Sequence, residues 1–178
     1  MDWTEITLDR LLRQDVRLVS YVPDQALAKL IDGFETHPET RCFTATREDE
    51  AVAIACGGAM GGVRSVALMQ SSGFGNIANV LASLATPYQI PVLMIVTERG
   101  ILGEFNPVQT PITRVLRSTL DGLSIPHVTL DDPNRVEFLV DRMASQCFNT
   151  QHPAAIIVSP ILTGGKTAPG SAPSKRAA

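Results

Sequence analysis

The sequence predicts an α/β fold, a three-layer αβα sandwich around a six-stranded, mostly parallel sheet. Apolar, β-branched runs alternate along the chain with segments whose apolar residues recur at helical spacing. The run at 90–97 (IPVLMIVT) is almost continuously apolar, as expected of a strand that is buried on both faces. Strands separated by helices imply right-handed crossovers and a parallel sheet with helices on both sides.

The expected strands alternate with helices after a short opening helix. Strands are expected at 16–22, 41–45, 64–70, 90–97, 125–130 and 153–160, and helices at 8–14, 24–34, 48–62, 76–86, 112–123 and 134–148. Asp24 and Thr46 are suitable N-caps for the second and third helices. Ligands bind beyond the carboxyl ends of parallel strands, so we expect a site among four loops. These loops are 21–25, 44–49, 70–76 and 97–111.

Length and composition restrict the classes of protein to consider. The 178 residues suffice for one domain with a full core, and 44% of them are apolar. No apolar run reaches the roughly 18 residues that a membrane span needs. The charged, amphipathic start of the chain is not typical of a secretory signal. We therefore expect a cytoplasmic protein that does not bind a membrane.

Charge is distributed unevenly along the chain. The formal net charge is −3, but residues 163–178 carry three cations and no acid, which leaves 12 cations against 18 acids in residues 1–162. An acidic body without a basic stripe, and with few aromatic residues, argues against nucleic-acid binding. The last segment is rich in Gly, Pro, Ser and Ala. We therefore expect one domain over 1–162 and a disordered tail over 163–178.

The cysteines and histidines do not form the pattern of a metal site or a nucleophile site. Cys42, Cys56 and Cys147 are odd in number and widely spaced, which favours reduced thiols of a cytosolic protein over a zinc site. No histidine has the neighbours of a catalytic triad, and the chain has no Walker A sequence. We expect this chain to supply no metal ligands.

Residues 46–50 (TREDE) follow the second expected strand and have two interpretations. The first is structural, since acids in the first turn of a helix face the positive end of its dipole. The second is functional. Glu48 would be a carboxylate at a strand end, partly withdrawn from water, that binds the ring nitrogen of a flat heteroaromatic cofactor. The pattern alone leaves both interpretations open.

Residues 70–76 (QSSGFGN) also have more than one interpretation. With Ala78 they match the loose dinucleotide fingerprint G-x-G-x-x-A, and Glu98 would then accept a hydrogen bond from the ribose. The match is weak, because it follows the third strand and not the first. A plain tight turn in which Asn76 begins a helix is a simpler explanation. A third possibility is that the loop offers backbone donors and amides to the cofactor held by Glu48.

The expected helix at 48–62 is built largely of small residues, with eight alanines and glycines between positions 51 and 62. Glycine in a helix costs on the order of 1 kcal/mol relative to alanine. Such a run is expected where another backbone must approach closely. The close contact would lie either within the monomer or in a subunit interface, and both alternatives remain open.

Four motifs in sequence order carry a family resemblance. Residues 21–24 (YVPD) are similar to a V-P-D turn, 47–51 (REDEA) to R-E-E-E-G, 69–76 (MQSSGFGN) to M-Q-N-S-G-L-G-N, and 103–109 (GEFNPVQ) to G-E-F-N-P-x-Q. The chain thereby resembles the pyrimidine-binding (Pyr) domain of thiamine-diphosphate-dependent enzymes over residues 5–162. The resemblance is strongest to the sulfopyruvate decarboxylase α-subunit family, with phosphonopyruvate decarboxylases next. Ser71 and Ala51 depart from the usual Asn and Gly.

The resemblance implies the thiamine-diphosphate-binding Pyr-domain fold and a role for individual residues. Glu48 would be catalytic, through a hydrogen bond to N1′ of the aminopyrimidine ring of thiamine diphosphate. Asp24 and Gln109 would also be catalytic, in substrate handling and proton relay. The further cofactor-binding residues that it implies are Pro23, Gln70, Ser72, Gly73, Phe74 and Asn76.

The resemblance also implies a second chain. The metal motif of the family, G-D-G followed further on by Asn, is absent from this sequence. That motif belongs to the diphosphate-binding (PP) domain. A β subunit that carries a PP domain is therefore expected to hold the diphosphate and Mg²⁺ in an α/β hetero-oligomer.

The implied reaction is the decarboxylation of a small anionic 2-oxoacid, with 3-sulfopyruvate, converted to sulfoacetaldehyde and CO2, as the first candidate. Arg47, Arg99 and Arg114 are candidates for the sulfonate, although each also fits an ordinary surface arginine. One alternative is a phosphonopyruvate decarboxylase or another thiamine-dependent decarboxylase or carboligase half. A second alternative is a non-enzymatic, Rossmann-like nucleotide-binding module.

Overall fold

Six parallel strands form the middle layer of the structure, a computed structural model that describes residues 2–165. Across the sheet they run in the order β2 (Arg41–Thr44), β1 (Val16–Tyr21), β3 (Arg64–Gln70), β4 (Val92–Thr97), β6 (Ala154–Val158) and β5 (His127–Leu130). Each neighbouring pair is parallel. The predicted αβα sandwich is confirmed, and the sheet expected to be mostly parallel is parallel throughout these six strands.

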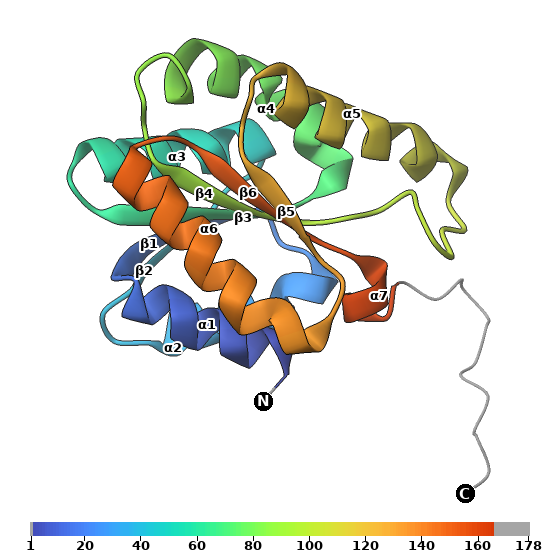
Figure 1. Cartoon of the computed structure of the whole chain (residues 1–178), viewed down its shortest axis with the longest axis horizontal. Coiled ribbons are helices and arrows are strands. Elements are labelled where there is room, and N and C mark those ends of the chain that lie inside the picture. The colour runs from blue at the N-terminus through green and yellow to red at the C-terminus, as the bar shows by residue number, and fades with distance from the viewer. Residues whose placement is uncertain (1, 166–178) are drawn as a thin grey trace, which may run out of the picture.

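Helices cover both faces of the sheet (Figure 1). On one face lie α1 (Trp3–Arg13), α2 (Ala28–Thr36) and α6 (Val136–Thr150), and on the other lie α3 (Glu48–Met60), α4 (Phe74–Val80) and α5 (Thr110–Gly122). This arrangement gives two apolar cores, one on each side of the sheet.

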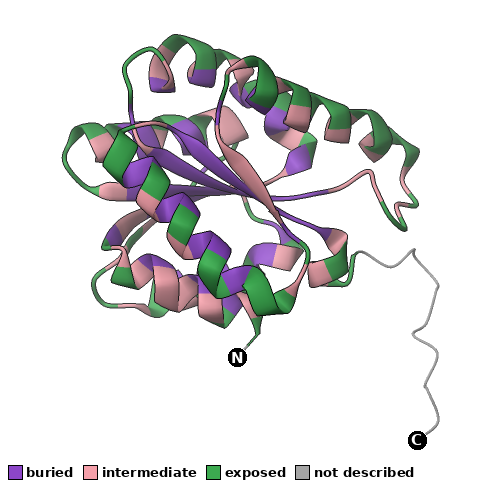
Figure 2. Ribbon diagram, in the orientation of Figure 1, coloured by how far each residue is buried: buried purple, intermediate pink, exposed green. Residues whose placement is uncertain are grey.

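The two cores explain why the strands are apolar almost without interruption. Alternate residues of a strand point to opposite faces. In β3, Val66 and Leu68 join the core under α1, α2 and α6, whereas Ala67 and Met69 join the core under α3, α4 and α5. Figure 2 accordingly shows buried central strands and helices that are buried only on their inner faces.

Short helical turns extend several elements, and two of them lie within the helices expected at 24–34 and 76–86. These are η1 (Gln25–Leu27), η2 (Ser71–Gly73), η4 (Pro107–Gln109) and η5 (Pro133–Arg135) before helices, the π-helical turn η3 (Leu81–Ala85) after α4, and α7 (Pro160–Thr163) after β6. Five of them, η1, η2, η4, η5 and α7, lie at the carboxyl edge of the sheet, beyond the ends of β1, β3, β4, β5 and β6. They therefore shape the loops where a ligand is expected.

The opening helix was predicted at 8–14, but α1 begins at Trp3. Asp2 caps it, because its carboxylate accepts hydrogen bonds from the backbone N–H groups of Thr4 and Glu5, both at 3.0 Å. Glu5 in turn accepts from the backbone N–H of Asp2 at 3.0 Å, which completes a capping box. This reciprocal cap fixes a helix start that the apolar periodicity alone did not reveal.

The small residues of α3 serve two purposes. A Cβ at Gly58 would overlap the Ser65 hydroxyl and lie 2.8 Å from Leu18 Cδ1, so the sheet approaches the helix closely there. A Cβ at Gly57 would meet no atom within 4 Å, and Gly57 is exposed. Packing within the monomer therefore explains Gly58. It does not explain Gly57, for which an interface remains a prediction.

All three cysteines are free thiols. Cys56 and Cys147 are buried, and desolvation raises the pKa of these thiols to about 11 and about 12. Cys42 is half-buried against the core beneath α1 and α2. Both buried thiols are thus held in the unreactive, protonated form at neutral pH.

Two further expectations concern the ends of the chain and the membrane. Within residues 2–165, no helix combines the length and the apolar character needed to cross a membrane. Of the tail predicted to be disordered over 163–178, residues 166–178 lie outside the described residues.

The two glycines of α3 provide a matched pair for measuring close packing. We expect Gly57→Ala to raise the free energy of unfolding by about 0.5–1 kcal/mol, because alanine favours the helix and the site is open. Gly58→Ala should instead lower it by about 1–3 kcal/mol through overpacking. Urea unfolding of the purified chain measures both values, and equal effects at the two positions would contradict the packing described for Gly58.

Candidate active site

Four loops meet at the carboxyl edge of the sheet. They follow β1, β2, β3 and β4, and they carry Asp24, Glu48, residues 70–76 and residues 98–109. Strands β1 and β3 are neighbours in the sheet, although β2 lies between them in sequence. The chain therefore leaves β1 toward one edge and returns at β3 on the other side, which makes a topological switch point. Ligands of α/β proteins bind at such points.

Glu48 opens α3 and points its carboxyl group at the loop after β3. A Cβ at Gly73 would overlap that carboxyl group, so the group lies directly against the Cα of Gly73. Asn76 Nδ2 donates a long hydrogen bond of 3.4 Å to Glu48 Oε2. The side chain is half-buried. Only glycine at position 73 leaves room for the carboxyl group to lie here.

Glu48 is not the cap of its own helix. Thr46 was a candidate N-cap, but Arg47 occupies that position and makes no side-chain cap hydrogen bond, so the expectation for Thr46 is wrong. Glu50 instead accepts a hydrogen bond of 2.7 Å from the backbone N–H of Thr46. Glu50 thus ties the segment before α3 to its first turn, whereas Glu48 is hydrogen-bonded to Asn76 of another loop.

Asp24 is a buried carboxylate, with 8% of its surface exposed, at the end of β1. It stands at the N-cap position of η1 as expected, but its side chain makes no cap hydrogen bond. Its oxygens accept hydrogen bonds from Gln70 Nε2 at 2.6 Å and from Thr97 Oγ1 at 2.8 Å. Asp24 thus joins the ends of β1, β3 and β4.

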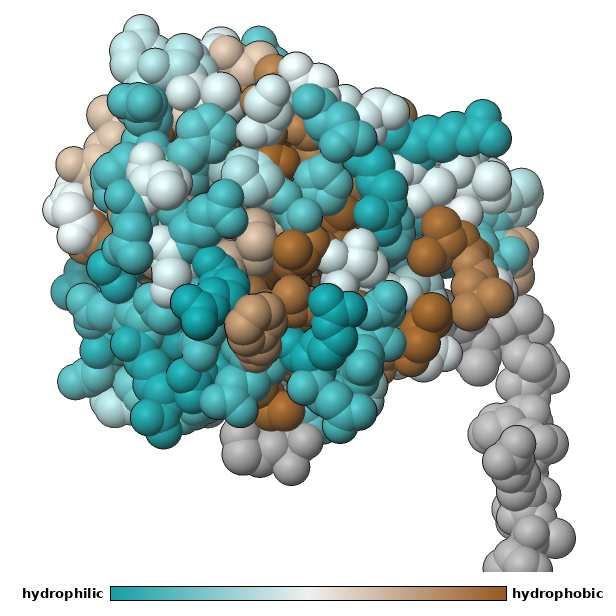
Figure 3. Space-filling model, in the orientation of Figure 1, coloured by the Kyte–Doolittle hydropathy of each residue, from teal (hydrophilic) through white to brown (hydrophobic). Residues whose placement is uncertain are grey.

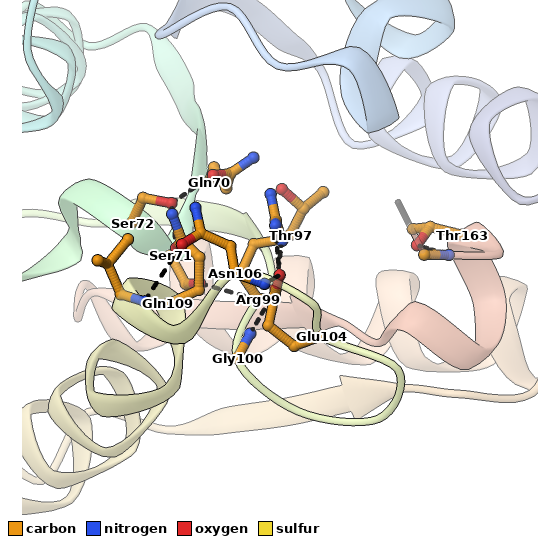
Figure 4. Close-up of polar contacts among 12 residues, drawn as sticks. Gln70, Ser71, Ser72, Thr97, Arg99, Gly100, Glu104, Asn106, Gln109 and Thr163 are labelled. Carbon is orange, nitrogen blue, oxygen red and sulfur yellow. Dashed lines mark hydrogen bonds and ion pairs between the residues drawn. The ribbon is translucent and has the colours of Figure 1, made fainter. Parts of the chain in front are cut away.

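Polar contacts continue from Gln70, the partner of Asp24, across the loops to Ser72 and Gln109 (Figure 4). The Ser72 hydroxyl contacts Gln70 Oε1 and lies 2.7 Å from Gln109 Oε1. A hydroxyl has a single proton, so Ser72 can donate to only one of the two amide oxygens. Gln70 is fixed by its bond to Asp24, so Ser72 donates to Gln70 and accepts from the amide nitrogen of Gln109 when the Gln109 amide is turned. A continuous polar chain therefore runs from Asp24 through Gln70 and Ser72 to Gln109 at the start of α5.

The loop after β4 is organised by an ion pair between Arg99 and Glu104. Both contacts of the guanidinium with the carboxylate are 2.7 Å, and only 12% and 7% of the two side chains are exposed. The Arg99 guanidinium lowers the pKa of Glu104 to about 2, and Glu104 raises the pKa of Arg99. Both groups are therefore charged throughout the physiological range.

A cavity of about 370 Å³ opens beside this ion pair. Its walls are formed by Asp24, Gln70 and Thr97, by the loop 98–105, and by Pro160, Thr163 and Gly165. Glu48 does not line it. Within residues 2–165, no group of three or more His, Cys, Asp or Glu side chains is placed to hold a metal ion.

The structure brings most of the predicted site residues together but sets two apart. Phe74 is fully buried in the core beneath α3, α4 and α5, where it packs under the loop rather than facing it. Pro23 is exposed beside Asp24. Their assignment to cofactor binding stays a prediction.

The arginine candidates differ in their partners. Arg47 is exposed and pairs with Asp49 at 3.0 Å, and Arg99 is held by Glu104. Arg114 is exposed on α5. Of the three, Arg99 alone lines the cavity, and its charge is already neutralised there.

Glu98 has a structural partner in place of the ribose that a dinucleotide site would require. It is buried and accepts hydrogen bonds from Arg117 at 2.9 and 3.1 Å and from Thr113 Oγ1 at 3.0 Å. These bonds tie α5 to the end of β4. The carboxylate is therefore committed to the fold, which removes the acid that the dinucleotide interpretation needed.

Sequence reasoning missed several residues that build the site. Ser71 is fully buried, and its hydroxyl accepts a hydrogen bond of 2.9 Å from the backbone N–H of Arg99. Thr97 and Glu104 were likewise not singled out. The opposite charges of Arg99 and Glu104, five residues apart around two glycines, were the one local signal of a closed loop.

Comparisons with known proteins agree with this arrangement of loops. The family model "Thiamine pyrophosphate enzyme, N-terminal TPP binding domain" matches residues 1–115. Sulfopyruvate decarboxylase subunit alpha of Methanocaldococcus jannaschii is 33% identical over 143 residues, which cover 80% of this chain and 85% of that one. Phosphonopyruvate decarboxylase of Streptomyces viridochromogenes is 44% identical over 89 residues, which cover 50% of this chain and 22% of that one.

A solved structure shares the fold. The chain resembles 2-oxoglutarate:ferredoxin oxidoreductase from Magnetococcus marinus with a TM-score of 0.72 at 12% identity. The match covers 92% of this chain and 29% of that one. At this identity the likeness concerns the fold alone.

The lowered pKa of Glu104 predicts how stability depends on pH. An unfolded glutamate has a pKa of about 4.3, so between about pH 4.5 and pH 2 the unfolded chain binds more protons at this position than the folded chain does. The stabilisation by the Glu104 carboxylate is thus complete above about pH 4.5 and is lost as the pH falls toward 2. Glu104→Gln should therefore lower the free energy of unfolding more at pH 6 than at pH 3.

Chemical unfolding of the purified chain at the two pH values measures this difference. Glu137→Gln is the matched control, because it removes an exposed ion pair with Arg10 and should change stability little at either pH. An equal loss at pH 6 and pH 3 for Glu104→Gln would mean that the charge of Glu104 does not stabilise the loop.

Proposed function

Because the chain belongs to the family of thiamine pyrophosphate enzymes, in the part that forms their N-terminal TPP-binding domain, we propose that it is the α subunit of a thiamine-diphosphate-dependent decarboxylase. The proposed reaction converts 3-sulfopyruvate to sulfoacetaldehyde and CO2. Its support is the similarity to sulfopyruvate decarboxylase α subunits along most of both chains. The structural observation that best supports the proposal is the contact between the Glu48 carboxyl group and Gly73.

The residues around Glu48 fit the aminopyrimidine ring of thiamine diphosphate. A side chain at position 73 would occupy the place of the Glu48 carboxyl group, and Asn76 approaches one of its oxygens. Helix capping does not account for this arrangement, because Glu48 follows the N-cap residue Arg47 and lies against the loop after β3. The half-buried carboxyl group is thus held for a contact outside the helix, and a ring nitrogen is a suitable partner.

Thiamine diphosphate, when bound, supplies the electron sink for the loss of CO2 from a 2-oxoacid. The task of Glu48 is to share a proton with ring nitrogen N1′ through its carboxyl oxygen. Gly73 and Asn76 orient that carboxyl group, and the loop that contains Gln70, Ser72 and Phe74 forms the surface beside it. Pro23 borders the same surface from the loop after β1.

Asp24 and Gln109 would act on the substrate side of the site. They are the ends of the polar chain that passes through Gln70 and Ser72, and hydroxyl and amide groups along such a chain can pass or orient a proton. Asp24 and Gln70 also line the cavity. We assign the chain of contacts to proton relay at the substrate.

A β subunit completes the site in this proposal. The sequence lacks the family's G-D-G…Asn metal motif, so the partner's PP domain would hold the diphosphate and Mg²⁺. Large apolar side chains are exposed around the cavity, among them Leu102 (71%), Val108 (71%), Ile161 (62%) and Phe105 (43%). Figure 3 shows apolar atoms gathered where the loop after β4 and α7 lie, at the right of the view. Exposed apolar surface of this kind is typical of an interface with another chain.

The sulfonate of the substrate would also be held by the partner. Among residues 2–165, the cavity walls contain three carboxylates, Asp24, Glu98 and Glu104, against one guanidinium, that of Arg99. Arg99 is neutralised by Glu104, so these walls do not attract a dianion.

Phosphonopyruvate is the second candidate substrate, supported by the 44% identity to a phosphonopyruvate decarboxylase over half of the chain. We place the complex in the cytoplasm, consistent with three free thiols.

Replacement of one carboxyl group tests the role of Glu48. In the complex reconstituted with its β subunit, Glu48→Gln should lower kcat by about 100-fold or more, the range associated with loss of an acid–base group. Glu50→Gln is the matched control. It lies on the same helical turn and keeps an oxygen for the backbone of Thr46, so its kcat should be unchanged.

Turnover of each variant is measured in parallel with sulfopyruvate, phosphonopyruvate and pyruvate. Subunit assembly is followed by gel filtration for both variants. If Glu48→Gln assembles and retains most of its turnover, Glu48 does not have the proposed role.

The split site predicts that the purified chain alone does not decarboxylate any of the three 2-oxoacids in the presence of thiamine diphosphate and Mg²⁺. Activity should appear on addition of the β subunit and should saturate at a fixed ratio of the two chains. CO2 release measured during titration with the β subunit tests this expectation. Strong activity before the addition would contradict a site shared between two chains.

A further inference from the structure

Residues 99–106 form a loop around one carboxylate, that of Glu104, which accepts hydrogen bonds from three of the loop residues. Its Oε1 accepts from Arg99 Nη2 at 2.7 Å and from the backbone N–H of Asn106 at 3.0 Å. Its Oε2 accepts from Arg99 Nε at 2.7 Å and from the backbone N–H of Gly100 at 3.1 Å. Four donors match the four lone-pair sites of a carboxylate. Glu104 therefore has the surroundings of a group that holds a loop in place.

The first two residues of this loop contact the segments that carry the polar chain of the site. The backbone N–H of Arg99 donates to the Ser71 hydroxyl, which is next to Ser72. The following residue, Gly100, with φ of +84°, lies so close to the first turn of α5 that a Cβ would overlap the carbonyl oxygen of Gln109. The position of the loop thus determines where Gln109 lies relative to Ser72.

We propose that Glu104 is a positioning residue that, through Arg99 and Gly100, holds Gln109 against Ser72 at the end of the polar chain that begins at Asp24. Arg99 is its counter-charge and not the receptor of the substrate's anionic group. Glu104 occupies the Nε and Nη2 side of the guanidinium, so an anion that took that side would have to displace Glu104 and release the loop. The inference deepens the proposed function and rests on it for its kinetic readout.

Kinetics distinguish this role of Glu104 from a direct contact with substrate. Glu104 lines the cavity, so a contact with a bound 2-oxoacid is the rival explanation. A substrate contact predicts an effect of substitution on KM. Positioning through Gln109 predicts an effect on kcat that disappears once Gln109 is removed.

A double-mutant cycle in the reconstituted complex separates the two explanations. We expect Glu104→Gln and Gln109→Ala each to lower kcat by about 10-fold, with KM within about 3-fold of the wild-type value. The double variant should be no slower than the slower single variant, because both act at one contact. Gly100→Ala should reproduce the kinetics of Glu104→Gln without touching either charge.

The matched control is Asp141→Asn, which breaks a remote bidentate ion pair of the same kind. Asp141 accepts from Arg10 at 2.9 and 2.6 Å between α6 and α1, on the opposite face of the sheet from α5. Its kcat and KM should match those of the wild-type complex. Hydrogen–deuterium exchange gives a second readout, and Glu104→Gln should speed exchange at residues 99–110 but not in α3.

Three results would overturn the inference. These are effects of Glu104→Gln and Gln109→Ala that multiply in the double variant, a rise in KM with kcat unchanged, and unaltered exchange at residues 107–110 in Glu104→Gln. A wild-type complex without decarboxylase activity would instead remove the proposed function, and the exchange measurement alone would then decide the positioning role of Glu104.

Discussion

The contact between the Glu48 carboxyl group and the Cα of Gly73 is the constraint on which the rest of the site depends. It joins the start of α3 to the loop after β3, and it exists because position 73 has no side chain. An acid in the first turn of a helix is stabilised by the dipole wherever it points. Here the Glu48 carboxyl group lies against Gly73 in another loop, and the helix dipole does not explain that direction. A ring nitrogen that shares its proton provides an explanation.

The charged groups that line the cavity do not favour the binding of a dianion. Asp24 is fixed by Gln70 and Thr97, Glu98 by Arg117, and Glu104 by Arg99. In the described part of the chain, the arginines beside the cavity, Arg99 and Arg117, are therefore already matched by acids. A substrate with two negative charges needs cations from elsewhere. The missing metal motif and the apolar rim of the cavity support the same proposal, that a second chain completes the site.

The sequence predicted the architecture well where burial imposes a pattern. Strand β3 was predicted at its observed limits, because a run buried on both faces ends abruptly at Arg64 and Gln70. The 3₁₀ turns and α7 are too short to show a period, and the start of α1 depends on a cap at Asp2. Glu48 and Gly73 were singled out through a family resemblance. Their contact joins residues far apart in the sequence, which no local pattern can reveal.

The distance between the Glu48 carboxyl group and the aminopyrimidine ring tests the central claim most directly. It is measured in a crystal structure of the chain assembled with its β subunit and thiamine diphosphate. The account predicts a carboxyl oxygen within about 3 Å of ring nitrogen N1′, with Gly73 still beneath it. A Glu48 side chain directed into bulk solvent, away from the ring, would contradict the account.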